Sequence, residues 1–74
     1  MRDSDYMDLK DALARNLRRL RYERGLTQED LSGLTGISAR YVGSIERAKV
    51  SASVTVLGKL ADALNVEPSI LITK

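Results

Sequence analysis

Leucines that recur at helical spacing, between residues typical of helix ends, constrain the fold of this chain more than any other feature. The first series is Leu9, Leu13, Leu17 and Leu20. This spacing places the four side chains on one stripe of a helix. Gly25 follows, and glycine readily takes the left-handed conformation in which helices end. We therefore predict a first helix over residues 6–24, with Asp5 as its N-cap.

Hydroxyl residues mark the expected starts of three further helices: Thr27, Ser38 and Ser53. Each hydroxyl can accept a hydrogen bond from the amides that a helix leaves unpaired at its start. The apolar positions that follow are Leu31 and Leu34, then Val42 and Ile45, then Val54, Leu57, Leu60, Ala61 and Leu64. Asn65 ends the fourth helix, because asparagine replaces glycine in the left-handed position, and a fifth helix spans residues 68–72. No alternating β-branched run favours a sheet, so the predicted fold class is all-α, a compact five-helix bundle.

The length of 74 residues bounds the organisation of the chain. Such a chain buries about 60% of the surface that its unfolded form exposes, so we expect a single domain over residues 1–74, with dimerisation as a natural supplement to a marginal core. Its apolar runs fall short of the roughly 20 residues that span a bilayer. The first eight residues hold three acids and one base, unlike the basic start of a secretion signal. We expect a cytoplasmic protein with no membrane partner.

Composition excludes most enzyme chemistry. The chain has no histidine and no cysteine, so it lacks the residues of zinc sites, of thiol catalysis and of serine triads. A reaction based on Tyr22 or Tyr41 with Glu46 or Asp62 would need a convergent acid and base that the sequence does not justify. We predict no catalytic residue, no metal, no cofactor and no small-molecule ligand.

The net charge of +2 is small but unevenly distributed. Residues 15–24 hold five arginines and one glutamate. Residues 39–49 are also basic, and the segment between these two is acidic. Arg15, Arg18, Arg19 and Arg24 are interpreted as a solvated helix face or as a diffuse field that speeds association with a polyanion.

Two helices joined by a short turn that contains glycine form the helix-turn-helix plan, here over residues 27–47. The segments that carry it are GLTQEDL at 25–31, GIS at 36–38, YVGSIER at 41–47 and LADALNV at 60–66. Together they closely resemble the Cro/repressor-type helix-turn-helix of the xenobiotic-response-element (XRE) family, over about residues 13–71. Short single-domain members, such as phage repressors and restriction-modification controller proteins, are similar in size. The resemblance implies a lambda-repressor-like bundle and a sequence-specific transcriptional regulator that binds a palindromic DNA operator as a homodimer.

The expected recognition helix is residues 39–47. With Val42 and Ile45 directed inward, the opposite stripe of this helix faces a major groove. The expected base contacts on that stripe are Ala39, Arg40, Gly43 and Ser44. Arg40 can donate two hydrogen bonds to guanine, so it is the first candidate for sequence readout. Gly43 costs about 1 kcal/mol relative to alanine in mid-helix; a close backbone approach, to DNA or to the preceding helix, and plain tolerance are equally good explanations.

Donors around the rim of the groove are expected to hold DNA phosphates. They are Gln28, Tyr41, Arg47, Lys49, Ser51 and Ser53. Gln28 opens the second helix, where amides and the helix dipole favour an anion, and the resemblance implies a phosphate-contacting glutamine there. Tyr41 is a phosphate donor through its hydroxyl, or it packs its ring at the margin of the core with the hydroxyl exposed, which is compatible with such a bond.

The resemblance also implies a partly buried structural ion pair between Arg21 and Glu46. Such a pair fixes geometry more than it adds net stability. Two positions depart from the family pattern: Ala48 replaces the common glycine, and Ala52 replaces the common proline. A left-handed Ala48 would cost about 1–2 kcal/mol, so a different path for the loop to Ser53 is an alternative.

Two further partners are predicted. Ile70, Leu71 and Ile72, with part of the fourth helix, are the expected homodimer interface, although closure of the core is an equally simple role for them. Glu29 and Asp30 lie beside the expected DNA face and are a candidate contact with RNA polymerase, although the helix dipole already accounts for acids at that position. The alternative function is an antitoxin-like or other protein-interaction module that uses the same fold.

Overall fold

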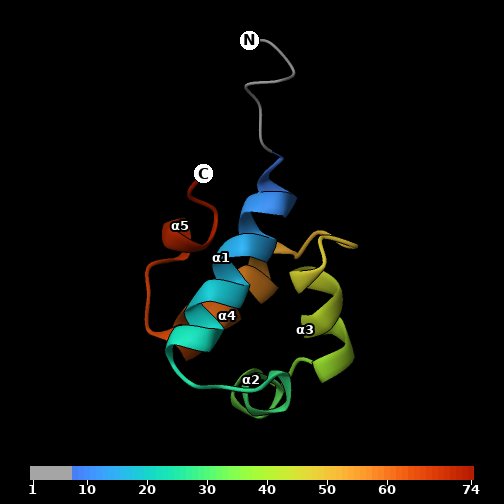
Figure 1. Ribbon diagram of the computed structural model, residues 1–74, viewed down its shortest axis with the longest axis vertical. Coiled ribbons are helices and arrows are strands. Elements are labelled where there is room, and N and C mark those ends of the chain that lie inside the picture. Colours follow the sequence, from blue (N-terminus) through green and yellow to red (C-terminus); the bar gives the residue numbers. More distant parts are fainter. Residues whose placement is uncertain (1–7) are drawn as a thin grey trace, which may run out of the picture.

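Five helices make up the part of the chain that the computed structural model describes, residues 8–74. They are α1 (Leu9–Glu23), α2 (Gln28–Thr35), α3 (Ala39–Glu46), α4 (Val54–Leu64) and α5 (Pro68–Leu71). Figure 1 shows α1 and α4 in the centre, α2 at one end, α3 at the side and α5 beside α1. The all-α class and the helix-turn-helix over α2 and α3 are confirmed.

The helix starts follow from local hydrogen bonds. Thr27 and Asp30 form a capping box, in which the Thr27 hydroxyl accepts from the Asp30 amide and the Asp30 carboxylate accepts from the Thr27 amide, both at 2.9 Å. The Ser38 and Ser53 hydroxyls accept from the amides of Tyr41 and Val56, each at 3.1 Å. These hydroxyl caps stand where the sequence predicts them.

The first helix begins later than predicted. Asp8 is the N-cap of α1, and its carboxylate accepts a hydrogen bond of 3.0 Å from the Lys10 amide. The helix therefore starts at Leu9 and not at residue 6. Asp5, the predicted cap, lies outside the described residues.

Helices α1, α3 and α4 end in the same backbone motif, with a left-handed residue after the last turn. These residues are Gly25, Ala48 and Asn65. After α3, the Lys49 amide donates to the Ser44 carbonyl and the Ala48 amide to the Ile45 carbonyl, both at 3.0 Å, which is the Schellman pattern. Ala48 takes a φ of 57° to make it. The loop after α3 therefore keeps the path that a glycine would give, and the predicted alternative path is wrong.

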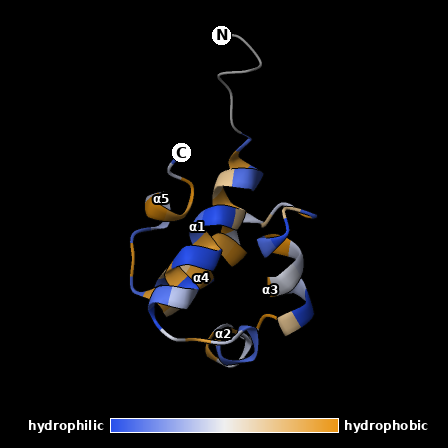
Figure 2. Ribbon diagram, in the orientation of Figure 1, coloured by the Kyte–Doolittle hydropathy of each residue, from blue (hydrophilic) through white to orange (hydrophobic). Residues whose placement is uncertain are grey.

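The core is built from the apolar stripes of all five helices. Its largest fully buried side chains are Leu17, Leu31, Val42, Ile45, Leu60, Leu64 and Leu71. Figure 2 shows the hydrophobic colour concentrated on α4 and α5, and hydrophilic turns on the outside of α1. Three leucine and valine positions that the spacing assigns to the core are instead exposed: Leu9 by 46%, Leu34 by 61% and Val54 by 86%.

Asn16 binds the end of α5 and the segment after it to α1. It is buried, and its side-chain amide donates to the carbonyls of Leu71 and Thr73 at 3.0 and 2.8 Å. The Arg15 guanidinium donates to the same Thr73 carbonyl at 2.7 Å. These bonds satisfy carbonyls at the end of α5, where a helix has no partners of its own. Within residues 8–74 no helix combines the length and the apolarity that a membrane crossing requires.

Candidate nucleic-acid interface

The turn between α2 and α3 presents α3 at the side of the molecule. Gly36 ends α2 with a φ of 76°, Ile37 is buried in the core, and Ser38 caps α3. Val42 and Ile45 are fully buried. The chain thus anchors one face of α3 and leaves the opposite face at the surface (Figure 1).

The outer stripe of α3 places three of the four expected base contacts at the surface. Arg40 is exposed, and Ala39 and Ser44 are half-buried. Gly43 is buried. A side chain at its position would lie 3.1 Å from Nη1 of Arg47 and 3.4 Å from Oε1 of Gln28. Only the Arg47 contact is tight, and the Gln28 atoms of α2 lie at ordinary contact distance. The side chains of Arg47 and Gln28 thus cover Gly43, and the structure does not offer it as a base contact.

A buried ion pair holds the end of α3 against α1. Arg21 Nε donates to Glu46 Oε2 at 2.6 Å, and Arg21 Nη2 donates to Glu46 Oε1 at 3.0 Å. The two side chains are only 8% and 4% exposed. Arg21 Nη1 donates to the Leu26 carbonyl at 2.8 Å, so the guanidinium also fixes the link between α1 and α2. The hydrogen bond to Glu46 raises the pKa of Arg21 above its ordinary value, so the guanidinium stays charged.

Two more donors converge on Glu46. Gln28 Nε2, from the first residue of α2, donates to Glu46 Oε1 at 3.1 Å. The Arg18 guanidinium donates to the Glu46 carbonyl, where a positive charge complements the carboxyl end of α3. Helix α3 is thus connected by polar contacts to both α1 and α2.

Sequence reasoning missed the roles of Arg18 and Asn16. It treated Arg18 as part of a solvated or diffuse basic face, and it did not consider Asn16. The spacing contains a signal for each: Arg18 lies three positions before Arg21, and Asn16 lies between Leu13 and Leu20 on the apolar stripe. Residues at those separations share a helix face. Spacing indicates only the helix face on which each side chain lies. It does not predict that Gln28 and Arg18 bind Glu46, because each of these bonds joins two different helices.

The expected phosphate donors differ in their exposure. Arg47, Lys49, Ser51 and Ser53 are exposed. Tyr41 is half-buried, with its ring against the core, as one of its two predicted roles requires. Gln28 is half-buried and already donates one hydrogen bond. An amide nitrogen carries two hydrogens, so Gln28 keeps a second one for a partner.

The residues expected to form a homodimer interface differ in their burial. Leu71 is fully buried and belongs to the core, so its assignment to an interface is wrong. Ile72 is half-buried against the core, and Ile70 is 42% exposed. Ile72 also lines an apolar groove of about 290 Å³ that includes Leu9, Leu57 and Val54.

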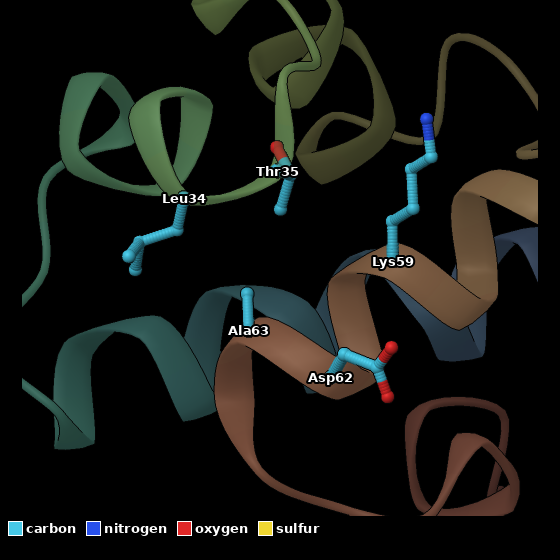
Figure 3. Close-up of a pocket in the computed structure, with 5 residues that line it drawn as sticks. All are labelled: Leu34, Thr35, Lys59, Asp62 and Ala63. Carbon is cyan, nitrogen blue, oxygen red and sulfur yellow. The ribbon is translucent and has the colours of Figure 1, made fainter.

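A second hollow, of about 390 Å³, lies between α2 and α4. Figure 3 shows Leu34 of α2 facing Ala63 of α4, with Lys59 extending beside Thr35. Asp62 is the remaining lining residue. The hollow is thus lined by one basic and one acidic side chain, which do not make up the acid, base and nucleophile of a catalytic site. Among residues 8–74, no group of histidine, cysteine, aspartate and glutamate side chains is arranged to hold a metal ion.

Comparison with known proteins agrees with this geometry. The helix-turn-helix family HTH_3 matches residues 17–71. The chain is 40% identical over 67 residues to the uncharacterised HTH-type transcriptional regulator y4dJ of Sinorhizobium fredii, an alignment that covers 90% of this chain and 87% of the relative. It is 38% identical over 76 aligned positions to the control protein C.SmaI of Serratia marcescens, with 100% of this chain and 90% of the relative covered.

A solved structure with the same fold is the restriction-modification controller protein C.AhdI of Aeromonas hydrophila. The TM-score is 0.81 and the sequence identity 42%, and the match covers 89% of this chain and 98% of that one. Sequence and structure therefore agree over nearly the whole of both chains. The chain belongs to the Cro/repressor-type (XRE) helix-turn-helix family, a family of DNA-binding transcriptional regulators and not of enzymes.

Proposed function

We propose that this regulator binds a palindromic operator as a homodimer, in the cytoplasm, with α3 in the major groove. The observation that carries the proposal is the outer stripe of α3, where Arg40 is exposed and Ser44 is half-buried at the surface. The helix that presents them is fixed by the buried Arg21–Glu46 pair. A helix held in this way can enter a groove without reorganising, so its side chains meet base edges in one register.

Arg40 and the rim donors have different roles in this proposal. Arg40 reads a guanine through two hydrogen bonds, and Ser44 and Ala39 contact neighbouring bases. Lys49, Arg47, Gln28 and the hydroxyls of Tyr41, Ser51 and Ser53 hold phosphates, which sets the register on the duplex without reading sequence.

Selection of bound sites from random duplexes, followed by salt titration, tests this division. Arg40→Ala is expected to relax preference at one base position by about 1–3 kcal/mol, whereas Lys49→Ala weakens all sequences alike and lowers the salt slope by about one. Arg19→Ala is the matched control, because Arg19 is an exposed arginine of α1 that pairs with Glu23 at 3.2 Å. Identical behaviour of the Arg40 and Lys49 variants would refute the assignment.

The homodimer is proposed to form through the apolar groove beside Val54. An isologous contact places the same surface on both subunits, so the surface must complement itself. This groove does so in two ways: it is apolar at Leu9, Val54 and Leu57, and it carries one acid and one base, Asp8 and Lys10. A helix-turn-helix dimer reads half-sites about 34 Å apart, and the proposed contact must place the two α3 helices at that separation.

Sedimentation of the protein without DNA tests the interface. Val54→Asn is expected to shift the protein to monomer, because it places a polar group in a dry contact. Leu34→Asn is the control, since Leu34 is also exposed but lines the other hollow. A Val54→Asn protein that remains dimeric, or a parent protein that is monomeric at high concentration, would reject this surface.

A contact with RNA polymerase is proposed at Glu29. Glu29 and Asp30 are both exposed on α2, but the Asp30 carboxylate is engaged in the capping box. Glu29→Gln should reduce activated transcription in a reconstituted assay while leaving operator affinity unchanged. An unchanged transcript level would exclude Glu29 as a contact with RNA polymerase.

A further inference from the structure

Gly43 differs from the other glycines in what surrounds it. All five glycines lie within residues 8–74, and a Cβ at Gly25, Gly33, Gly36 or Gly58 would find nothing within 4 Å. A Cβ at Gly43 would lie 3.1 Å from Nη1 of Arg47, and 3.4 and 3.5 Å from Oε1 and Nε2 of Gln28. A Cβ at Gly43 would therefore press on the Arg47 guanidinium and lie in ordinary contact with the Gln28 amide.

These two groups come from different helices. Gln28 is the first residue of α2, and Arg47 is the C-cap of α3. Glu46 orients the Gln28 amide through a hydrogen bond of 3.1 Å to its nitrogen. Glu46 is in turn fixed by Arg21, so the position of the Gln28 amide is set by this ion pair. The second N–H of the Gln28 amide remains for another acceptor.

We infer that Gly43 is a positioning residue, whose missing side chain leaves room for the Arg47 guanidinium beside the Gln28 amide, so that these two groups bind one DNA phosphate together. The inference rests on the proposed function, because the ligand is the backbone of the operator. A guanidinium and an amide N–H both donate hydrogen bonds, which an anionic phosphate oxygen accepts. Their joint placement over a bare stretch of α3 gives a phosphate a site that neither side chain would make alone.

A purely structural role would place backbone or core atoms around Gly43. The three nearest atoms outside the backbone of α3 instead belong to the far ends of two polar side chains, which can move away at little cost to the fold. Alanine is also a better helix former than glycine. The inference therefore predicts opposite signs for one substitution: Gly43→Ala keeps or raises stability and lowers DNA affinity.

Thermal unfolding and salt-dependent binding to a selected operator and to an unrelated duplex test the inference. Gly58→Ala, in mid-α4, and Gly33→Ala, in mid-α2, are the matched controls. Gly43→Ala should raise Tm as the controls do and should lower affinity for both duplexes by about tenfold, the order of one charge-assisted hydrogen bond. Its salt slope should fall by about one, and the controls should bind as the parent does.

A double-mutant cycle separates positioning from packing. In a Gln28→Ala background, the further loss of affinity from Gly43→Ala should be smaller than in the parent, because one of the two donors is already absent. Full additivity, a fall in Tm, unchanged binding, or altered preference at a single base position would each overturn the inference. If the parent and both control variants bind no duplex, the proposed function itself fails, which is a separate result.

Discussion

Replacement of Ala48 by glycine is expected to stabilise the protein. Ala48 holds a φ of 57° at the end of α3, a conformation that costs a residue with a Cβ roughly 1–2 kcal/mol. Glycine relieves that cost but gains conformational freedom in the unfolded chain, which offsets about 0.4–1 kcal/mol. The net gain lies between about 0 and 1.6 kcal/mol, with a middle value of about 0.8 kcal/mol. That middle value corresponds to a rise in Tm of roughly 3–6 °C for a domain of this size.

Urea titration and thermal unfolding measure this gain, and two variants define its cause. Ala63→Gly, within α4 and with ordinary helical backbone, should lose up to about 1 kcal/mol, the opposite sign for the same chemical change. Ala48→Val should destabilise, because a branched side chain fits poorly at positive φ. An Ala48→Gly protein less stable than the parent would show that the left-handed alanine costs less than the entropy that glycine adds to the unfolded chain, and the argument from φ would be wrong.

Three further predictions concern the polar contacts. Glu46→Ala should cost about 3–5 kcal/mol in urea unfolding, because it leaves Arg21 buried without its partner; a neutral effect would contradict a structural role for the pair. Asn16→Ala should cost about 1–3 kcal/mol, since it removes the donor to two carbonyls near the end of α5, and hydrogen exchange should quicken in residues 68–72 before the rest of the chain. Hydrogen bonds from the Thr27 backbone amide and its hydroxyl hold the pKa of Asp30 below its ordinary value of 3.8, so the ionised carboxylate stabilises the fold above that pH. The free energy of unfolding of the parent should exceed that of Asp30→Asn above pH 3.8, and this difference should disappear as pH falls below 3.8. A difference that does not depend on pH would exclude this linkage.

The sequence predicts the helices well because their ends are set by local chemistry. Thr27, Ser38 and Ser53 act through hydrogen bonds to amides no more than three positions away. The range of each apolar stripe is less predictable, because it depends on where a neighbouring helix stops. Leu9 and Val54 are the first residues of their helices and extend past the core.

The candidate site divides along the same line. The outward direction of Arg40 follows from the spacing of Val42 and Ile45, since all three lie on one short helix. The burial of Gly43 does not follow from spacing, because it depends on the side-chain conformation of Arg47 and on Gln28, which comes from α2. The bond from Arg18 to the Glu46 carbonyl is hidden for the same reason: the two residues are 28 positions apart. The homodimer interface, which depends on a second chain, stays a prediction.

The position of α3 is controlled by a few polar groups. Arg21 from α1 and Gln28 from α2 donate to the carboxylate of Glu46, while Arg18 donates to its carbonyl. A buried ion pair adds little net stability compared with apolar packing, but it tolerates few geometries. In a chain of 74 residues with a small core, apolar contacts alone leave a short helix free to tilt, because Val42 and Ile45 anchor only one of its faces. The convergence on Glu46 removes that freedom at the end of α3 that carries Arg47, and so couples the register of the outer stripe to the positions of both preceding helices.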